Sequence, residues 1–214
     1  MEKNWSLRFK EFCELLFWKM KKWNQKQLDN EHYAFFFTEY FQFTYDFYNN
    51  KTILDIGCGP RGSLEWANNT KERIGLDPLV NKYKSLGIDK HKMSYVNAYV
   101  EEMPFANNYF DFISAFNSLD HVADIHLAVK EIKRVLKPGG LFLLIVDIHA
   151  MPTFTEPQTF TWQMANEYFN DMIVLEEKHL ERIYPTRIYS NLRAAKPLVN
   201  TKKNGVLTLK LQKK

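Results

Sequence analysis

The chain has 214 residues, a formal net charge of +4, 45% hydrophobic residues and 25% charged residues. This length and composition predict one soluble globular domain with a sizeable core, and no apolar run approaches the roughly 20 residues of a membrane span. Only two cysteines, Cys13 and Cys58, are present, so a disulfide framework is excluded. Charges interrupt the apolar positions near the N-terminus, which argues against a secretory signal. We therefore expect a cytoplasmic protein.

Residues 1–50 contain 16 of the 33 aromatic residues. Several apolar residues recur at three- and four-residue intervals and predict one face of a helix: Trp5, Phe9, Phe12, Leu16, Met20 and Trp23. This extension could be a lid over a substrate pocket, a helix on a membrane surface or a helix packed on a sheet. The sequence favours the packed helix.

From Lys51 onward, short apolar runs alternate with turns and helical patterns. Strands are expected at 51–56, 73–76, 94–96, 110–116, 141–146, 172–182 and 206–211, and helices at 63–69, 125–136 and 161–169. The helix at 125–136 is expected to stop at Lys137-Pro138-Gly139-Gly140. This alternation predicts an α/β fold with a mostly parallel, seven-stranded sheet and helices on both faces.

The C-terminal segment is basic, with no acidic residue after Glu181. Such a segment could attract an anionic substrate or nucleic acid. The favoured interpretation is a solvated edge strand that lysines protect against aggregation.

The segment Leu54-Asp55-Ile56-Gly57-Cys58-Gly59-Pro60-Arg61-Gly62 carries the strongest local signal. Glycines at the carboxyl end of a strand allow a tight turn and the close approach of a ligand. Asp77 follows 20 residues after Gly57, where a carboxylate can accept hydrogen bonds from ribose hydroxyls. These glycines also satisfy the G-x-G-x-x-G pattern, so this segment alone fits both NAD and S-adenosylmethionine.

Asp55 distinguishes the two ligands, because its charge would repel a pyrophosphate and attract a sulfonium or ammonium group. Six segments also occur in the order typical of one family: 54–59, 75–78, 101–105, 109–111, 117–122 and 131–140. Together they resemble the class I S-adenosylmethionine-dependent methyltransferases, whose fold is Rossmann-like. The resemblance covers about residues 50 to 147.

The resemblance implies a cofactor site with four parts. Asp55, Gly57, Cys58 and Gly59 would surround the methionine part of S-adenosylmethionine; Asp77 and Pro78 would hold the ribose; Tyr99 and Val100 would contact the adenine; Asn117 and Ser118 would lie beneath the transferring methyl. The family often has an acidic residue where this chain has Tyr99, so Tyr99 or the amide of Asn97 would replace it.

Proton transfer to a base can accompany methyl transfer, and candidate bases follow the strands. His149, in Asp147-Ile148-His149, is the preferred proton acceptor, with His121 as the second catalytic candidate; Asp147 and Glu156 lie nearby in the sequence. Asp124 is expected to cap the next helix, and no metal site is predicted.

The expected function is methylation of a small-molecule oxygen or nitrogen nucleophile. Residues 117–119 lack the Asn-Pro-Pro-aromatic pattern that resembles amino-methyltransferases of nucleic-acid bases, so nucleic acid is not the expected substrate. A nucleic-acid- or partner-binding module on the same fold, or an NAD-type oxidoreductase, remains an alternative. The oligomeric state is left open.

A single methyltransferase domain is expected over residues 1–214. It comprises the aromatic extension 1–50, a cofactor-binding core 51–147 and a substrate-side half 148–214, in which residues 184–203 could wall the acceptor pocket.

Overall fold

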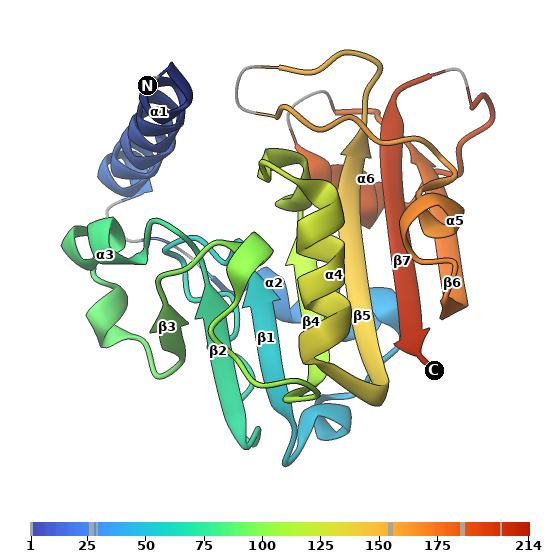
Figure 1. The fold of residues 1–214 in the computed structure, drawn as a ribbon, viewed down its shortest axis with the longest axis horizontal. Helices are drawn as coiled ribbons and strands as arrows, with labels where there is room; N and C mark the ends of the chain where they lie inside the picture. Colours follow the sequence, from blue (N-terminus) through green and yellow to red (C-terminus); the bar gives the residue numbers. More distant parts are fainter. Residues whose placement is uncertain (1, 26–27, 29, 154–155, 185–186, 202) are drawn as a thin grey trace.

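A computed structural model describes residues 2–25, 28, 30–153, 156–184, 187–201 and 203–214. In this part of the chain, seven strands form one sheet in the order β3-β2-β1-β4-β5-β7-β6 (Figure 1). The strands are β1 (Thr52–Ile56), β2 (Glu72–Leu76), β3 (Ser94–Val96), β4 (Phe110–Phe116), β5 (Leu136–Ile148), β6 (Met172–Glu181) and β7 (Gly205–Lys213). All seven predicted strands are therefore present.

The sheet is mixed rather than uniformly parallel. The pairs β1–β2, β1–β4, β2–β3 and β4–β5 are parallel, whereas β7 runs antiparallel to both of its neighbours, β5 and β6. The prediction of a mostly parallel sheet is thus confirmed for the half that carries the glycine motif. Parallel strands bring their carboxyl ends to one edge, where ligands of open α/β sheets bind.

The interpretation of the C-terminal segment as an edge strand is wrong, because β7 lies between β5 and β6. Its lysines are used inside the fold. Lys210 donates to the carbonyl of Phe41 at 2.9 Å, and Lys213 donates to the carbonyls of Lys133 and Leu136, each at 2.7 Å. These ammonium groups satisfy backbone oxygens that helices and loops leave unpaired.

Helices cover both faces of the sheet (Figure 1). On one face, α4 (Ile125–Val135) and α5 (Met164–Tyr168) pack on an aliphatic cluster. On the other face, α2 (Tyr33–Phe37) and α6 (Ile188–Ala194) pack on a cluster rich in aromatic rings. The remaining helices are α1 (Glu2–Gln25), α3 (Val80–Tyr83), and the 3₁₀ turns η1 (Glu39–Phe41), η2 (Tyr45–Tyr48), η3 (Lys84–Leu86), η4 (Ile88–Lys90), η5 (Val100–Glu102) and η6 (Leu119–His121).

Helix α4 forms where its sequence predicts it. The Asp124 carboxylate accepts hydrogen bonds from the backbone N–H groups of His126 and Leu127, which confirms the predicted N-cap. Its buried residues recur at helical spacing on one face: Ile125, Ala128, Val129, Ile132 and Val135. Lys133 and Arg134 lie in the last turn, where positive charge favours the helix dipole.

The helix predicted at 63–69 is absent; these residues form consecutive turns. Gly62 has a φ of +79°, and the Ser63 hydroxyl is used to bond Asp55. The Glu65 carboxylate accepts hydrogen bonds from the backbone N–H groups of Lys92 and Met93. Hydrogen bonds to distant parts of the chain therefore outweigh the weak local preference of residues 63–69 for a helix.

Helix α1 does not pack on the sheet, so the favoured sequence interpretation is wrong. It lies beside α3 (Figure 1), where Leu15 and Trp18 contact a cluster around Leu79, Val80 and Tyr83. The opposite side exposes six large apolar residues: Phe9, Phe12, Leu16, Phe17, Met20 and Trp23. No helix in the described parts of the chain has the length and apolar character to cross a bilayer.

Candidate cofactor and acceptor site

The glycine motif forms a turn at the carboxyl end of β1. Gly57 and Gly59 have φ values of +68° and +56°, a region that L-residues with side chains rarely adopt. The Gly57 N–H donates to the carbonyl of Leu76 at 2.8 Å, and a Cβ on Gly57 would collide with Ser118. The turn is thus held between β2 and the loop after β4, with its backbone close to both.

Asp55 is buried at the end of β1, beneath this turn. The hydroxyls of Ser63 and Ser114 both donate to its carboxylate, the latter at 2.6 Å. Burial nevertheless raises the pKa of Asp55 to about 6, because two neutral hydrogen bonds do not replace the hydration of a charge. A cationic group beside Asp55 would stabilise its ionised form.

Asp77, at the end of β2, is the second buried carboxylate of the site. It accepts hydrogen bonds from the N–H of Gly59 at 3.1 Å and from the N–H of Leu79 at 2.8 Å. Burial raises its pKa to about 7. Each carboxylate oxygen can accept more than one hydrogen bond, so ribose hydroxyls could still bind here. Pro78 lies in the sequence between Asp77 and Leu79, and it is partly exposed.

Cys58 and Val100 differ from the other predicted contacts because their side chains are buried in the core. The Cys58 thiol lies against Gly75, where any side chain would collide with it. Val100 packs in the aliphatic cluster. Both residues can therefore meet a cofactor only through their backbone.

Tyr99 and Asn97 occupy the predicted adenine end. The Tyr99 hydroxyl donates to Glu11 of α1 at 2.8 Å, and its side chain is 42% exposed. The Asn97 amide oxygen accepts a hydrogen bond from the N–H of Asn81 at 3.1 Å. Asn97 is therefore used to hold the start of α3, which leaves Tyr99 as the accessible polar group.

Helix α1 covers the glycine turn. The Trp18 ring lies so close to Gly59 that a Cβ there would meet it at 3.1 Å, and the Arg61 guanidinium lies 5.5 Å from the ring centroid. Arg61 also donates to Gln25 at 3.0 Å, and Lys82 pairs with Glu11 at 2.7 Å. The residues that contact the site lie off the apolar face predicted from the sequence, so their role was missed.

Asn117 and Ser118 follow β4, and Ser118 lies against Gly57 of the turn. Asn117 has a φ of +52°, and its buried side-chain oxygen has no hydrogen-bond partner among the described residues. The Ser118 hydroxyl donates to the carbonyl of Ile56 at 2.9 Å. Asp124, not Asn117, caps α4. A strained backbone and an unpaired buried amide are typical of ligand-binding positions.

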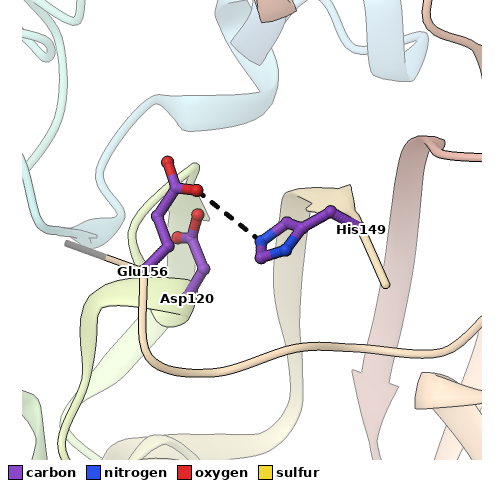
Figure 2. Close-up of side chains that lie close together, drawn as sticks. All are labelled: Asp120, His149 and Glu156. Carbon is purple, nitrogen blue, oxygen red and sulfur yellow. Dashed lines mark ion pairs between the residues drawn. The ribbon is translucent and has the colours of Figure 1, made fainter. Parts of the chain in front are cut away.

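A second group of titratable side chains lies beyond β4 and β5 (Figure 2). Asp120 on η6, His149 after β5 and Glu156 on the next loop turn toward one another, and His149 Nε2 lies 3.6 Å from Glu156 Oε2. His121 Nε2 lies 3.9 Å from Asp120 Oδ1. Asp147 pairs with Arg182 at 2.9 Å. The fold therefore brings together the four candidate bases that follow strands in the sequence: His121, Asp147, His149 and Glu156.

A comparison with protein-family models matches residues 54–144 to the methyltransferase domain family. The matched segment runs from Asp55 and the glycine turn to β5, and so includes most of the site described above. Residues 54–144 belong to the class I S-adenosylmethionine-dependent methyltransferases. The predicted family and its cofactor are confirmed.

Curated relatives of this methyltransferase domain match over part of their length. The chain is 29% identical over 130 residues to sterol 24-C-methyltransferase erg6 of Aspergillus fumigatus, covering 56% of this chain and 30% of that protein. It is 34% identical over 109 residues to the ubiquinone/menaquinone biosynthesis C-methyltransferase UbiE of Rickettsia typhi, covering 45% and 44%. The chain thus spans less than half of either relative.

Solved methyltransferase-like structures share the fold. The [4+2]-cyclase SpnF superposes with a TM-score of 0.60 at 18% identity, covering 77% of this chain and 75% of that chain. Geranyl diphosphate C-methyltransferase from Streptomyces coelicolor, solved with Mg²⁺, geranyl diphosphate and S-adenosylhomocysteine, gives 0.55 at 20% identity, covering 77% and 71%. Because one of these is named a cyclase, the fold alone does not decide the reaction.

Proposed function

We propose that the protein transfers a methyl group from S-adenosylmethionine to a small molecule. The observation that carries this proposal is the pair of buried carboxylates, Asp55 and Asp77, beside the glycine turn. Burial raises the pKa of both groups, and a positive charge beside them would favour their ionised forms. A sulfonium and an ammonium group supply that charge, whereas a pyrophosphate would add to the repulsion.

The cofactor contacts we propose are those that the family resemblance implies. We assign the methionine part to Asp55 and the backbone of Gly57, Cys58 and Gly59; the ribose to Asp77 and Pro78; the adenine to Tyr99 and the backbone of Val100; and the space beneath the methyl to Asn117 and Ser118. The unpaired Asn117 oxygen supports its place, because a buried acceptor gains a partner when a ligand donates to it.

The acceptor we propose is a small molecule bound between residues 51–147 and 148–214 of one domain. The sequence favours oxygen or nitrogen as the nucleophile, while the names of the sterol and quinone relatives specify carbon. Acceptors of all three kinds therefore belong in the first screen. Nucleic acid is not favoured, because the fold itself uses Lys210, Lys213 and Arg182. We also propose a cytoplasmic setting, on the sequence argument that two cysteines do not make a disulfide framework.

His121 and His149 stand at the acceptor end of the proposed site. His121 has a partly exposed ring, as a base that meets a substrate requires, and we propose it as a proton acceptor. Replacing it with Ala should lower kcat and leave the affinity for S-adenosylmethionine unchanged. His149 is enclosed by carboxylates and is not proposed as a base.

Calorimetric titration with S-adenosylmethionine and S-adenosylhomocysteine tests the cofactor site. Binding at micromolar strength should be lost in Asp77→Ala and kept in the control Asp171→Ala, which removes an exposed carboxylate paired with Lys133. NADH should give no heat. A folded protein, free of copurified cofactor, that binds NADH but neither sulfur ligand would overturn the proposal.

Transfer is then tested with S-adenosylmethionine labelled in the methyl group. The protein is incubated with panels of phenols, amines, sterols and quinone precursors, and label in the organic phase is counted. Asp77→Ala should abolish any signal. Label that appears only in RNA or protein would contradict the small-molecule part of the proposal.

A further inference from the structure

Three side chains from separate segments point their donor atoms into one small volume. One ligand atom each from Asp120, His149 and Glu156 lies within 4.8 Å of the others (Figure 2). Two ligands bound at about 2.1 Å to one metal ion lie roughly 3 to 4 Å apart. The 3.6 Å between His149 Nε2 and Glu156 Oε2 falls in that range. Movements within the reach of side-chain rotation would complete the set.

Polar atoms of two of these side chains are buried without a hydrogen bond among the described residues, although His121 Nε2 lies 3.9 Å from Asp120 Oδ1 and His149 Nε2 lies 3.6 Å from Glu156 Oε2. Asp120 is 0% exposed, and neither of its carboxylate oxygens has a hydrogen-bond partner among the described residues. His149 is 8% exposed, and its Nε2 also lacks one. Buried polar atoms without partners are rare, and for a carboxylate the penalty is largest. This pair therefore indicates a missing positive group and not only a cluster of acids.

The orientation of His149 strengthens the point. Its Nδ1 lies 2.7 Å from the carbonyl oxygen of Met151, which can only accept a hydrogen bond, so Nδ1 carries the proton. In the neutral ring, Nε2 then presents a lone pair toward two carboxylates. A hydrogen bond from one ring nitrogen to a carbonyl is also the arrangement that orients histidine ligands of metal ions.

Negative charge is in excess around the cluster. Asp147 lies two residues before His149, and its Oδ1 is buried without a partner in the described structure. Its Oδ2 accepts a hydrogen bond from Arg182 at 2.9 Å. Three carboxylates, those of Asp120, Asp147 and Glu156, thus lie around His149, and the Arg182 guanidinium pairs with one of them, Asp147. His121 Nε2 lies 3.9 Å from Asp120 Oδ1. A doubly charged cation would restore the balance.

We propose that Asp120, His149 and Glu156 bind one divalent transition-metal ion of the Mn²⁺ or Zn²⁺ kind. One imidazole and two carboxylates suit such ions, whereas Mg²⁺ prefers oxygen ligands and retains its water. Three protein ligands leave positions open, as in metal sites that act on substrates. Asp120 lies two residues after Ser118, so an oxygen of the acceptor could occupy an open position.

This assignment changes two sequence-based expectations. No metal site was expected, and His149 was the preferred proton acceptor. Nε2 cannot hold a metal ion and accept a proton at the same time, so the metal role replaces the base role for His149. The competing explanation is a doubly protonated His149 that pairs with both carboxylates and needs no metal.

The test is metal binding by the full chain, after treatment with a chelator, using Mn²⁺ alone. Loss of the free Mn²⁺ signal in electron paramagnetic resonance should show one saturable site per chain. Asp120→Asn and His149→Ala should each weaken binding at least tenfold, because each removes a ligand and loss of even an outer partner costs 10–100-fold. His126→Ala, which removes a histidine on the exposed first turn of α4, should leave binding unchanged. Zn²⁺ should compete for the same site.

Thermal unfolding gives a second measurement of metal binding, and it does not depend on enzymatic activity. Mn²⁺ should raise the Tm of the unsubstituted protein and leave that of His149→Ala unchanged. Absence of saturable binding, or equal binding by all variants, would overturn the proposal in favour of the protonated histidine. S-adenosylmethionine affinity, measured on the same samples, reports separately on folding and on the proposed cofactor site.

Discussion

Cofactor affinity should depend on pH in a direction that the two buried carboxylates determine. The change is a shift from pH 7.5 to pH 6.0, which protonates Asp77 (pKa about 7) and part of Asp55 (pKa about 6) in the unbound protein. A cationic ligand needs both groups ionised, so protons must leave before it binds. Binding should therefore weaken as the pH falls.

The size of the effect follows from linkage. If only ionised Asp77 binds, the dissociation constant of S-adenosylmethionine rises about eightfold over this interval, and including Asp55 makes the rise about fifteenfold. This corresponds to roughly 1.6 kcal/mol of binding free energy. The interval stays below the range in which an α-amino group titrates, near 7.7–8.0.

Calorimetry at four pH values, in buffers with different ionisation enthalpies, measures both the affinity and the protons released. At pH 6.0 we expect release of about 1.4 protons per cofactor bound, roughly 0.9 from Asp77 and 0.5 from Asp55. Asp55→Asn should bind more weakly and show a smaller pH dependence, whereas Asp171→Asn should behave like the unsubstituted protein. Affinity that is constant, or that increases at low pH with proton uptake, would refute the reasoning.

Three further predictions concern stability. Gly57→Ala places a Cβ against the loop after β4 and should lower the free energy of unfolding by more than about 1 kcal/mol in urea denaturation. The control Gly139→Ala is also at positive φ, but a Cβ there meets open space, so it should cost about 1 kcal/mol. Asp124→Ala removes the cap of α4 and should lower the free energy of unfolding by about 1 kcal/mol by the same assay. The raised pKa values of Asp55 and Asp77 contribute stability that is present at low pH and lost as the pH rises through 6 to 7, so the ligand-free protein should be about 1 kcal/mol more stable at pH 6.5 than at pH 8. Constant stability over that interval would contradict these pKa values.

The central strands were predictable because they are short apolar runs that are buried on both faces of the sheet. Residues 110–116 and 141–146 are examples, and both lie within observed strands. The place of β7 was not predictable from its own sequence. Lysines in a strand suit an exposed edge, but here Lys210 and Lys213 reach backbone carbonyls that only the folded chain brings near.

The N-terminal helix shows the same limit. Periodicity predicted a helix and an apolar face, and the helix exists. Periodicity does not say what a face contacts, and Trp18, on another side of α1, is the residue that meets Gly59. Similarly, Asp120 and His149 are 29 residues apart, and only the adjacent strands β4 and β5 bring them together.

Both ends of the site have the same electrostatic character, and this links the two proposals. Asp55 and Asp77 at one end, and Asp120 at the other, are buried carboxylates whose hydration is lost without full replacement. Burying such groups costs folding free energy. Cations that bind only to the folded state offset this cost directly. The cofactor and the metal ion should therefore each stabilise the fold separately, and together they should raise the Tm more than either does alone. Equal Tm values with one ligand and with both would show that they compete for a single site.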